Sequence, residues 1–151
     1  MRRLASFLAL SAWERRVFLR ALLLLPRTAL RIRWRGLRGA QAPMASAAPT
    51  GTTPPADAQS LAQRIAWLVD AAARRGMFRA SCLPRSLTLQ QLLQERGIAS
   101  ELRVGVRKHA GRLEAHAWIE CHGAPLLESA QVHERFAAFG EAVAPGAGAS
   151  R

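Results

Sequence analysis

Hydrophobic residues recur at the helical period of about 3.6 positions in three stretches of the chain. Pro26 follows the first stretch and is expected to end or kink that helix, with a short helical continuation over residues 28–35. Gly76 and Gly97 follow the second and third stretches, where glycine is a common helix stop. The pattern therefore predicts helices over residues 4–25, 59–75 and 82–96.

From residue 99 onward the hydrophobic period changes to two, which is typical of β-strands. Apolar and polar side chains alternate over residues 101–107 and again over 112–121, with a turn between the two runs. One face of this sheet is expected to be apolar and the other polar, and His116 lies on the polar face. A helical half followed by an antiparallel sheet makes the predicted fold class α+β.

The turn after the second strand decides which residue faces His116. A three-residue loop over residues 121–123 would place Gly123 in the left-handed conformation. With that loop, Glu128 becomes the direct cross-strand neighbour of His116, at a Cβ separation of about 4.5–5.5 Å that lets a carboxylate bond an imidazole nitrogen. A two-residue turn at His122 and Gly123 would instead shift the register and send Glu128 to the opposite face.

Composition divides the chain into a folded core and less regular flanks. Residues 36–58 are rich in glycine, alanine, proline, threonine and serine, a composition typical of a flexible linker. A chain of 151 residues has room for one catalytic domain. We therefore expect a basic helical arm (1–35), the linker (36–58), an enzyme core (59–137) and a disordered tail (138–151).

The net charge of +12 is concentrated near the N-terminus. Residues 1–38 hold ten arginines and one acidic residue, whereas the rest of the chain holds twelve basic and nine acidic residues. A basic arm of this kind fits nucleic acid, an anionic lipid surface or an acidic protein. No nucleic-acid-binding motif accompanies it, so nucleic acid is not expected as a partner, while peripheral membrane contact through the arm stays open.

The first twelve residues imitate a secretory signal peptide, with a basic start, a short apolar run and small residues at its end. The charged run at residues 14–16 and the second apolar run argue against export, and arginines interrupt the only candidate membrane span. Two cysteines in a chain of this length do not make a disulfide framework. A cytoplasmic protein is therefore expected.

Cys82 opens the third predicted helix, and His116 follows thirty-four residues later on a strand. A cysteine at a helix start with a histidine on a later strand fits a nucleophile with its general base, because the helix dipole and a nearby imidazolium both favour a thiolate. Glu128 would orient the histidine as a third member, and Glu120, on the same strand face as His116, is the alternative. The pattern favours a cysteine peptidase with catalytic Cys82, His116 and Glu128.

The polar face of the sheet is expected to look onto a substrate cleft. Trp118 would form a wall of this cleft, and Gly105 would leave backbone room for a peptide. Arg107 and Lys108 continue the strand of Gly105 and either form an exposed edge or bind an acidic peptide. The cysteines and histidines lack the paired close spacing of zinc motifs, so neither a metal nor another cofactor is expected.

Several stretches of the chain together form a recognisable pattern. They are Cys82-Leu83-Pro84-Arg85-Ser86-Leu87, the run from Leu102 to Lys108, Ala115-His116-Ala117-Trp118-Ile119-Glu120 and, in the arm, Glu14-Arg15 and Leu19-Arg20-Ala21-Leu22. This pattern resembles the leader peptidases of lasso-peptide biosynthesis, the stand-alone protease half of the split B protein. The resemblance covers nearly the whole chain apart from the linker and the tail, and it implies a transglutaminase-like or papain-like cysteine protease fold.

The resemblance implies a peptidase that removes the leader from a ribosomally made precursor peptide, with Cys82 as nucleophile and His116 as base. Glu128 stands where the family usually has aspartate. The resemblance also implies a separate leader-recognition protein acting in trans and a cyclase that joins the new N-terminus to an acidic side chain. The basic arm, Arg107 and Lys108 would then dock this complex. Two other functions stay open: a non-catalytic peptide-binding member of the same fold, and a transglutaminase-type acyl transferase.

Overall fold

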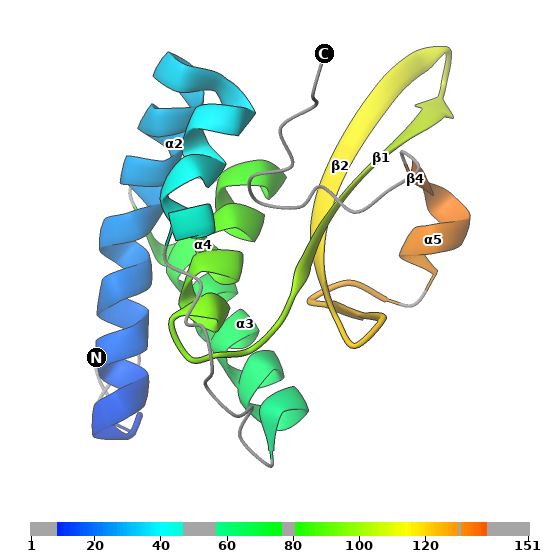
Figure 1. Cartoon of the computed structure of the whole chain (residues 1–151). Coiled ribbons are helices and arrows are strands. Elements are labelled where there is room, and N and C mark those ends of the chain that lie inside the picture. The colour runs from blue at the N-terminus through cyan, green and yellow to red at the C-terminus, as the bar shows by residue number, and fades with distance from the viewer. Residues whose placement is uncertain (1–8, 47–56, 77–80, 130, 139–151) are drawn as a thin grey trace.

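Helices and an antiparallel sheet form separate layers of the molecule (Figure 1). The computed structural model describes residues 9–46, 57–76, 81–129 and 131–138. The three longer helices lie on one side of the sheet and the short helix α5 on the other, which confirms the predicted α+β class. The elements are α2 (Ala12–Ser46), α3 (Ala58–Arg75), α4 (Cys82–Gln94), β1 (Glu101–His109), β2 (Arg112–Cys121), β3 (Ala124–Leu126), α5 (Val132–Arg135) and β4 (Ala137–Ala138).

Helix α2 begins with a reciprocal hydrogen-bond pattern between Ser11 and Glu14. The Ser11 backbone N–H donates to the Glu14 carboxylate at 2.6 Å, and the Ser11 hydroxyl donates to the same oxygen at 2.8 Å. The Glu14 N–H donates in turn to the Ser11 hydroxyl at 3.4 Å, which makes a capping box. The two bonds that the Glu14 carboxylate accepts from Ser11, above all the one from the backbone N–H, lower the pKa of that carboxyl. Arg64 of α3 also donates to Glu14, so the start of α2 is tied to α3.

Helix α2 is part of the core, which differs from the predicted appended arm. Ala21 and Leu25 are at most 4% exposed and lie in one cluster with residues of α3 and α4. Thr28, beyond the proline, is also buried, and its hydroxyl accepts a hydrogen bond from Thr88 of α4 at 3.3 Å. Pro26 therefore does not end the helix, because side chains on both sides of it pack into the same core.

The helix also continues into the segment that composition predicts as a linker. α2 runs to Ser46, with non-helical backbone at Gly36, where φ is 67° and ψ is −176°. A positive φ has no steric cost for glycine, so the chain can change direction there and resume the helix. The predicted linker is therefore wrong over residues 36–46. Its remainder (47–56) and the predicted tail from residue 139 onward lie outside the described residues.

Helices α3 and α4 follow the predicted boundaries closely. α3 spans one residue more than the predicted 59–75, and α4 ends two residues before the predicted residue 96. Gly97 has a φ of 69°, and the Ile98 N–H donates to the Leu93 carbonyl at 3.0 Å, which confirms the glycine stop. Leu92 and Leu93 are fully buried between the other helices and the sheet.

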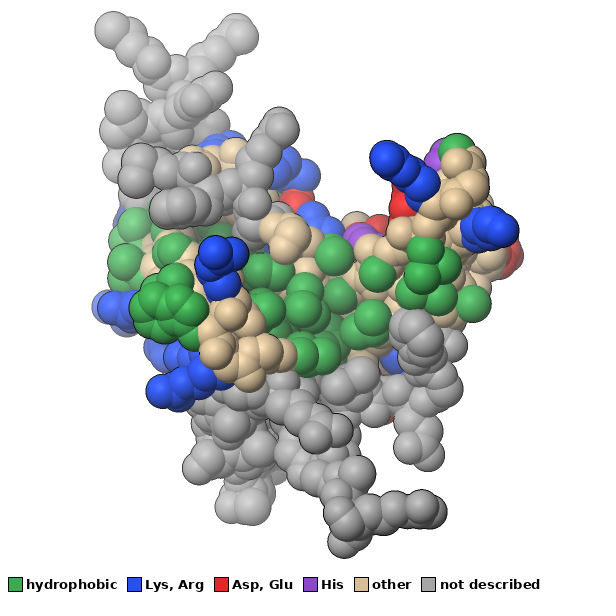
Figure 2. All heavy atoms as spheres, turned by 90° about the horizontal axis from the view of Figure 1, so that it is seen from above, with side chains coloured by type: hydrophobic (Ala, Val, Ile, Leu, Met, Phe, Trp, Pro, Cys, Tyr) green, Lys and Arg blue, Asp and Glu red, His purple; other side chains and the backbone are tan. Residues whose placement is uncertain are grey.

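The sheet has the strand order β3-β2-β1-β4, and β1 and β2 form a long hairpin. Its closed end extends beyond the helices, because Leu113, on the predicted apolar face, is 75% exposed. Figure 2 shows this end standing out from the body of the molecule with Lys and Arg side chains at its tip. The predicted apolar face is therefore covered over only part of its length.

At the other end of the hairpin both faces of β2 are buried. Ala117 and Ile119 pack toward the helices, as the alternation predicts. Trp118 and Glu120, on the predicted polar face, are only 2% and 5% exposed. Trp118 packs there against Val132 and Phe136, on and just after α5, so this part of the polar face is an interior surface.

Candidate active site

Cys82 is the first residue of α4, as predicted. Its side chain is half-buried and packs against the edge of the main core. Ser81, at the N-cap position, makes no side-chain capping hydrogen bond, so its hydroxyl leaves the start of α4 uncapped. Cys82 therefore lies at the positive end of the helix dipole, where a negative charge is favoured.

His116 and Glu128 form a hydrogen-bonded pair, with His116 Nε2 3.0 Å from Glu128 Oε1. Because an ionised carboxylate can only accept, this contact favours the tautomer of a neutral imidazole that carries its proton on Nε2 and its lone pair on Nδ1. The imidazole ring lies 6.1 Å from the Trp118 ring in a stacked arrangement and 5.1 Å from the Phe136 ring. These contacts hold the ring in one orientation.

Glu128 reaches His116 by a route that differs from the predicted register. Cys121 pairs with Ala124, so the turn is the two-residue alternative at residues 122–123, with positive φ at both positions. That register would turn Glu128 to the other face, but pairing ends at Leu126 and Leu127 has a φ of 67°. The left-handed residue breaks the strand and returns Glu128 to the face of His116. The predicted contact between His116 and Glu128 is therefore present, but the three-residue loop that was predicted to produce it is wrong.

The left-handed backbone at Leu127 should therefore control the position of Glu128. Glycine adopts this φ without steric cost, so Leu127→Gly is expected to keep the His116–Glu128 contact. Its free energy of unfolding is expected to lie between that of the wild type and about 1 kcal/mol above it. Leu127→Val is expected to lose about 1–2 kcal/mol, because a β-branched residue tolerates this region poorly. Urea unfolding of both variants measures the difference. Equal stability of the two variants would contradict a strand break that depends on positive φ.

Arg85 links Glu128 to the helical layer. It lies one turn after Cys82 on α4, and its guanidinium donates to Glu128 at 3.3 Å and to Asp70 of α3 at 3.0 Å. Asp70 is buried and also pairs with Arg74. The sequence signal for this link was a single carboxylate among the apolar positions of α3, where a charge needs a partner. The hydrophobic pattern alone did not identify Arg85 or Asp70 as part of the site.

The first two turns of α4 dock beside the strand residue that follows His116. The Ser86 hydroxyl donates to the Ala117 carbonyl at 3.0 Å, and both groups are buried. Cys82 lies four residues, about 6 Å, before Ser86 along the helix axis. Within the described residues, no hydrogen bond joins Cys82 to His116, whose Nε2 contacts Glu128. In enzymes without substrate, the hydrogen bond between nucleophile and base is often long.

Glu120, the alternative third member, is engaged elsewhere. It accepts hydrogen bonds from the Trp118 indole at 2.8 Å and from Arg103 at 3.1 Å, and His133 Nε2 lies 3.4 Å away. Glu120 is 5% exposed, and its carboxylate lies beside His133 of α5. Glu128, and not Glu120, is the carboxylate in contact with His116.

Trp118 and Gly105 do not face an open cleft, which corrects the predicted substrate-binding roles. Trp118 is 2% exposed. A Cβ at Gly105 would lie 3.0 Å from the Phe136 Cβ and 3.1 Å from both the Ala137 carbonyl and the Trp118 ring. The space that Gly105 leaves is therefore filled by the chain's own segment after α5, whose strand β4 pairs with β1.

A hollow of about 470 Å³ lies beside the His116–Glu128 pair. Its walls carry charges of both signs: Arg107 pairs with Glu114 at 2.6 Å, and Arg135 lies near Phe136. Lys108 is exposed and does not line it. The sequence-predicted Arg107 thus borders the candidate site, whereas Lys108 stands outside it. The full lining is Arg107, Glu114, Ala115, His116, Glu128, Val132, Arg135 and Phe136.

The two cysteines differ in environment, so alkylation should separate them. Cys121 is fully buried, and burial raises the pKa of its thiol, whereas Cys82 is half-buried at a helix start. Brief iodoacetamide treatment of the native protein is expected to add one adduct, on Cys82, at a rate at least about tenfold above that of Cys121. Peptide mapping by mass spectrometry measures this, with the urea-unfolded protein as the control that labels at both positions. Comparable labelling of Cys121 in the native protein would contradict the assigned environments.

Two features are absent from the described part of the chain. No cluster of three or more histidine, cysteine, aspartate or glutamate side chains is arranged there to hold a metal ion. None of the helices described combines the length and the apolar character needed to cross a bilayer.

A comparison with protein families finds one described as the transglutaminase-like superfamily, whose model matches residues 22–140. No curated protein and no solved structure matches the chain. The matched span begins inside α2 and includes Cys82, His116 and Glu128. It therefore extends over both the helical layer and the sheet that meet at the candidate site.

Proposed function

Because the chain belongs to the transglutaminase-like superfamily, we propose that it is a cysteine peptidase with a Cys82, His116 and Glu128 triad. The observation that carries this proposal is the 3.0 Å contact between His116 Nε2 and Glu128, next to the helix that begins at Cys82. A carboxylate that fixes one imidazole nitrogen and leaves the other free is the arrangement that general-base catalysis requires.

The chemistry follows from these three side chains. His116 Nδ1 accepts the thiol proton, and the Cys82 sulfur attacks the carbonyl carbon of the scissile amide. The amide C–N bond then breaks as His116 returns the proton to the leaving amine, which leaves a thioester on Cys82. Water, deprotonated by His116, attacks the thioester and releases the acid and the free thiol. Glu128 stabilises the imidazolium that forms in both steps, and the helix dipole stabilises the thiolate.

We propose that the substrate is the precursor of a lasso peptide, cut at the end of its leader in the cytoplasm. The support for this substrate is the likeness of residues 82–87 and 115–120 to the leader peptidases of that pathway. In this scheme a separate leader-recognition protein presents the precursor, and a cyclase uses the new N-terminus. The hollow beside His116, with Arg107 and Arg135 on its rim, would receive the residues around the cut.

Incubation of the purified protein with a precursor peptide and its recognition protein tests this proposal. The expected result is the appearance of two peptides whose masses add up to that of the precursor plus one water. A mass increase equal to that of an added primary amine minus ammonia, without cleavage, would favour acyl transfer instead. Binding of the precursor with no change in mass, at any ratio of recognition protein, would favour a non-catalytic peptide-binding protein and overturn the peptidase.

A further inference from the structure

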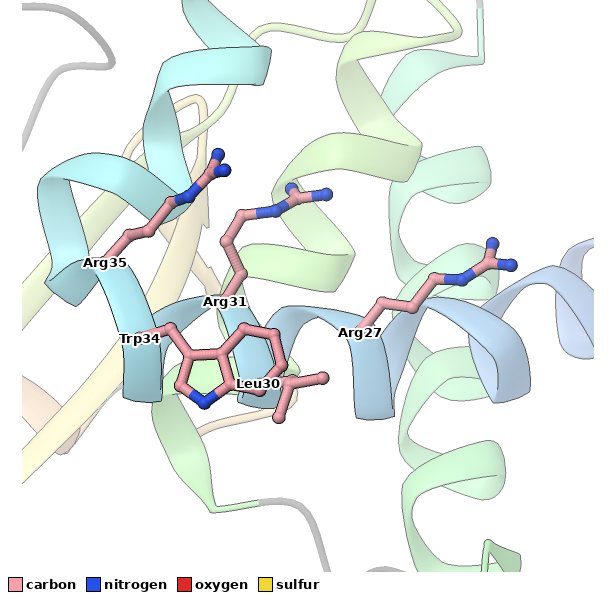
Figure 3. A pocket seen from close by; sticks show the side chains of 5 residues that line it. All are labelled: Arg27, Leu30, Arg31, Trp34 and Arg35. Carbon is pink, nitrogen blue, oxygen red and sulfur yellow. The ribbon is translucent and has the colours of Figure 1, made fainter.

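The outer face of helix α2 carries a row of arginines beside a row of exposed apolar side chains. Arg27, Arg31 and Arg35 are spaced four residues apart, so they lie on one side of the helix. Figure 3 shows their guanidinium groups extending from the same side of α2, with Leu30 and Trp34 next to them. The five side chains surround an open hollow of about 330 Å³.

Arg27, Arg31 and Arg35 make no ion pair within the described residues, whereas several other arginines of the protein do. Arg20, on the same helix, is paired with Glu95 at 2.7 Å, and Arg85 is paired with two carboxylates. Three like charges on successive turns repel one another, so the row costs stability unless an anion lies against it. This charge pattern points to an anionic partner.

Three large apolar side chains of this face are exposed. Trp34 is 75% exposed and Leu23 is 61% exposed, while Leu30 is 45% exposed. These positions are separated by seven and four residues, which places them in one stripe adjacent to the arginine row. The opposite face of the same helix is buried through Ala21 and Leu25, so the exposed stripe is not needed for the core.

We propose that the outer face of α2 is a docking surface for an anionic lipid membrane. A helix with arginines beside tryptophan and leucine is suited to lie in the interface of a bilayer, where the guanidinium groups meet phosphates and the apolar side chains enter the acyl region. Protein partners bind an exposed tryptophan in a matching pocket, whereas a bilayer accepts a convex helix along its whole length. The three charges extend over about 12 Å of helix, and a surface of many phosphates can neutralise all of them together.

This placement leaves the candidate active site accessible. The sheet with His116 lies on the far side of α4 from α2 (Figure 1). A protein bound to lipid through the outer face of α2 would therefore present the hollow beside His116 away from the bilayer. The inference does not depend on the proposed peptidase activity, because it uses no residue of the triad.

Co-sedimentation of the full-length protein with phospholipid vesicles tests the surface. The wild type is expected to bind vesicles of phosphatidylcholine with one third phosphatidylglycerol at low ionic strength, and to bind pure phosphatidylcholine at least about tenfold more weakly. Arg27→Glu with Arg35→Glu is expected to weaken binding to anionic vesicles by about tenfold or more, and Trp34→Ala by about fivefold.

Matched controls separate the surface from net charge and from folding. Arg75→Glu with Arg112→Glu makes the same change in net charge at two exposed positions outside α2, and Trp67→Ala removes another partly exposed tryptophan. Both controls are expected to bind like the wild type. Equal losses in the controls, or no binding of the wild type to anionic vesicles, would overturn the proposal. Binding of the α2 face to a poly-glutamate peptide with no binding to vesicles would assign it to an acidic protein and also overturn the proposal.

Discussion

Replacement of Cys82 by alanine is expected to lower kcat/KM for leader release by about 10⁴-fold or more. The variant lacks the thiol at the start of α4 that is proposed to form the covalent intermediate. His116→Ala is expected to cause a loss of similar size, because the thiol then has no base. The double variant is expected to be no slower than either single variant, since the two residues act as one unit. Precursor cleavage followed by mass spectrometry, at several enzyme concentrations, measures these rates.

Two controls make this result specific to catalysis. Cys82→Ser keeps a side chain of similar size and replaces the thiol by a hydroxyl. Because a hydroxyl needs far more activation than a thiol, this variant should also be nearly inactive. Trp67→Ala, at an exposed position of α3, should keep full activity. The thermal unfolding midpoints of all variants should lie close to that of the wild type, because Cys82 is only half-buried. Leader release by Cys82→Ala at more than a few per cent of the wild-type rate would rule out Cys82 as the nucleophile.

The sequence predicted the elements that have a strong local signal. Hydrophobic period and glycine stops located α3 and α4 within two residues, and alternation located both strands of the long hairpin. These signals work because the residues concerned bury one face locally. The start of α4 at Cys82 and the strand position of His116 followed from the same signals.

The errors arose where distant parts of the chain meet. Pro26 would end an isolated helix, but packing of α2 against α4 outweighs that local cost. The alternation of β2 cannot reveal that Phe136, after α5, covers Trp118. The two-residue turn at residues 122–123 was foreseen as an alternative, yet nothing in the local pattern indicates the left-handed Leu127 that restores the contact of Glu128 with His116. Such contacts depend on tertiary structure and not on periodicity.

Glu128→Gln is expected to lower kcat by about 10²–10⁴-fold with little change in KM. The amide can still hydrogen-bond His116, so the ring remains near its place, but the negative charge that accompanies the imidazolium is lost. The pH dependence of kcat/KM should also change shape, whereas a purely structural defect would lower the rate equally at every pH.

Glu120→Gln is the matched comparison, because the Glu120 carboxylate contacts Trp118 and Arg103 and not His116. A larger loss in Glu120→Gln than in Glu128→Gln would contradict the assignment of the triad.

Arg85 should act on the same step through Glu128, as a positioning residue. Arg85→Met removes the guanidinium that pairs with both Glu128 and Asp70, so each carboxylate loses one ion pair. It is expected to lower kcat by about 10–100-fold and the free energy of unfolding by about 2 kcal/mol, because Asp70 is buried. Arg85→Lys keeps the charge but reaches one carboxylate at a time, so it should restore stability more than activity.

In the double variant Arg85→Met with Glu128→Gln, the loss of kcat should be close to that of Glu128→Gln alone, because Arg85 is expected to affect catalysis only through that carboxylate. Fully additive losses would mean that Arg85 acts on the reaction by another route.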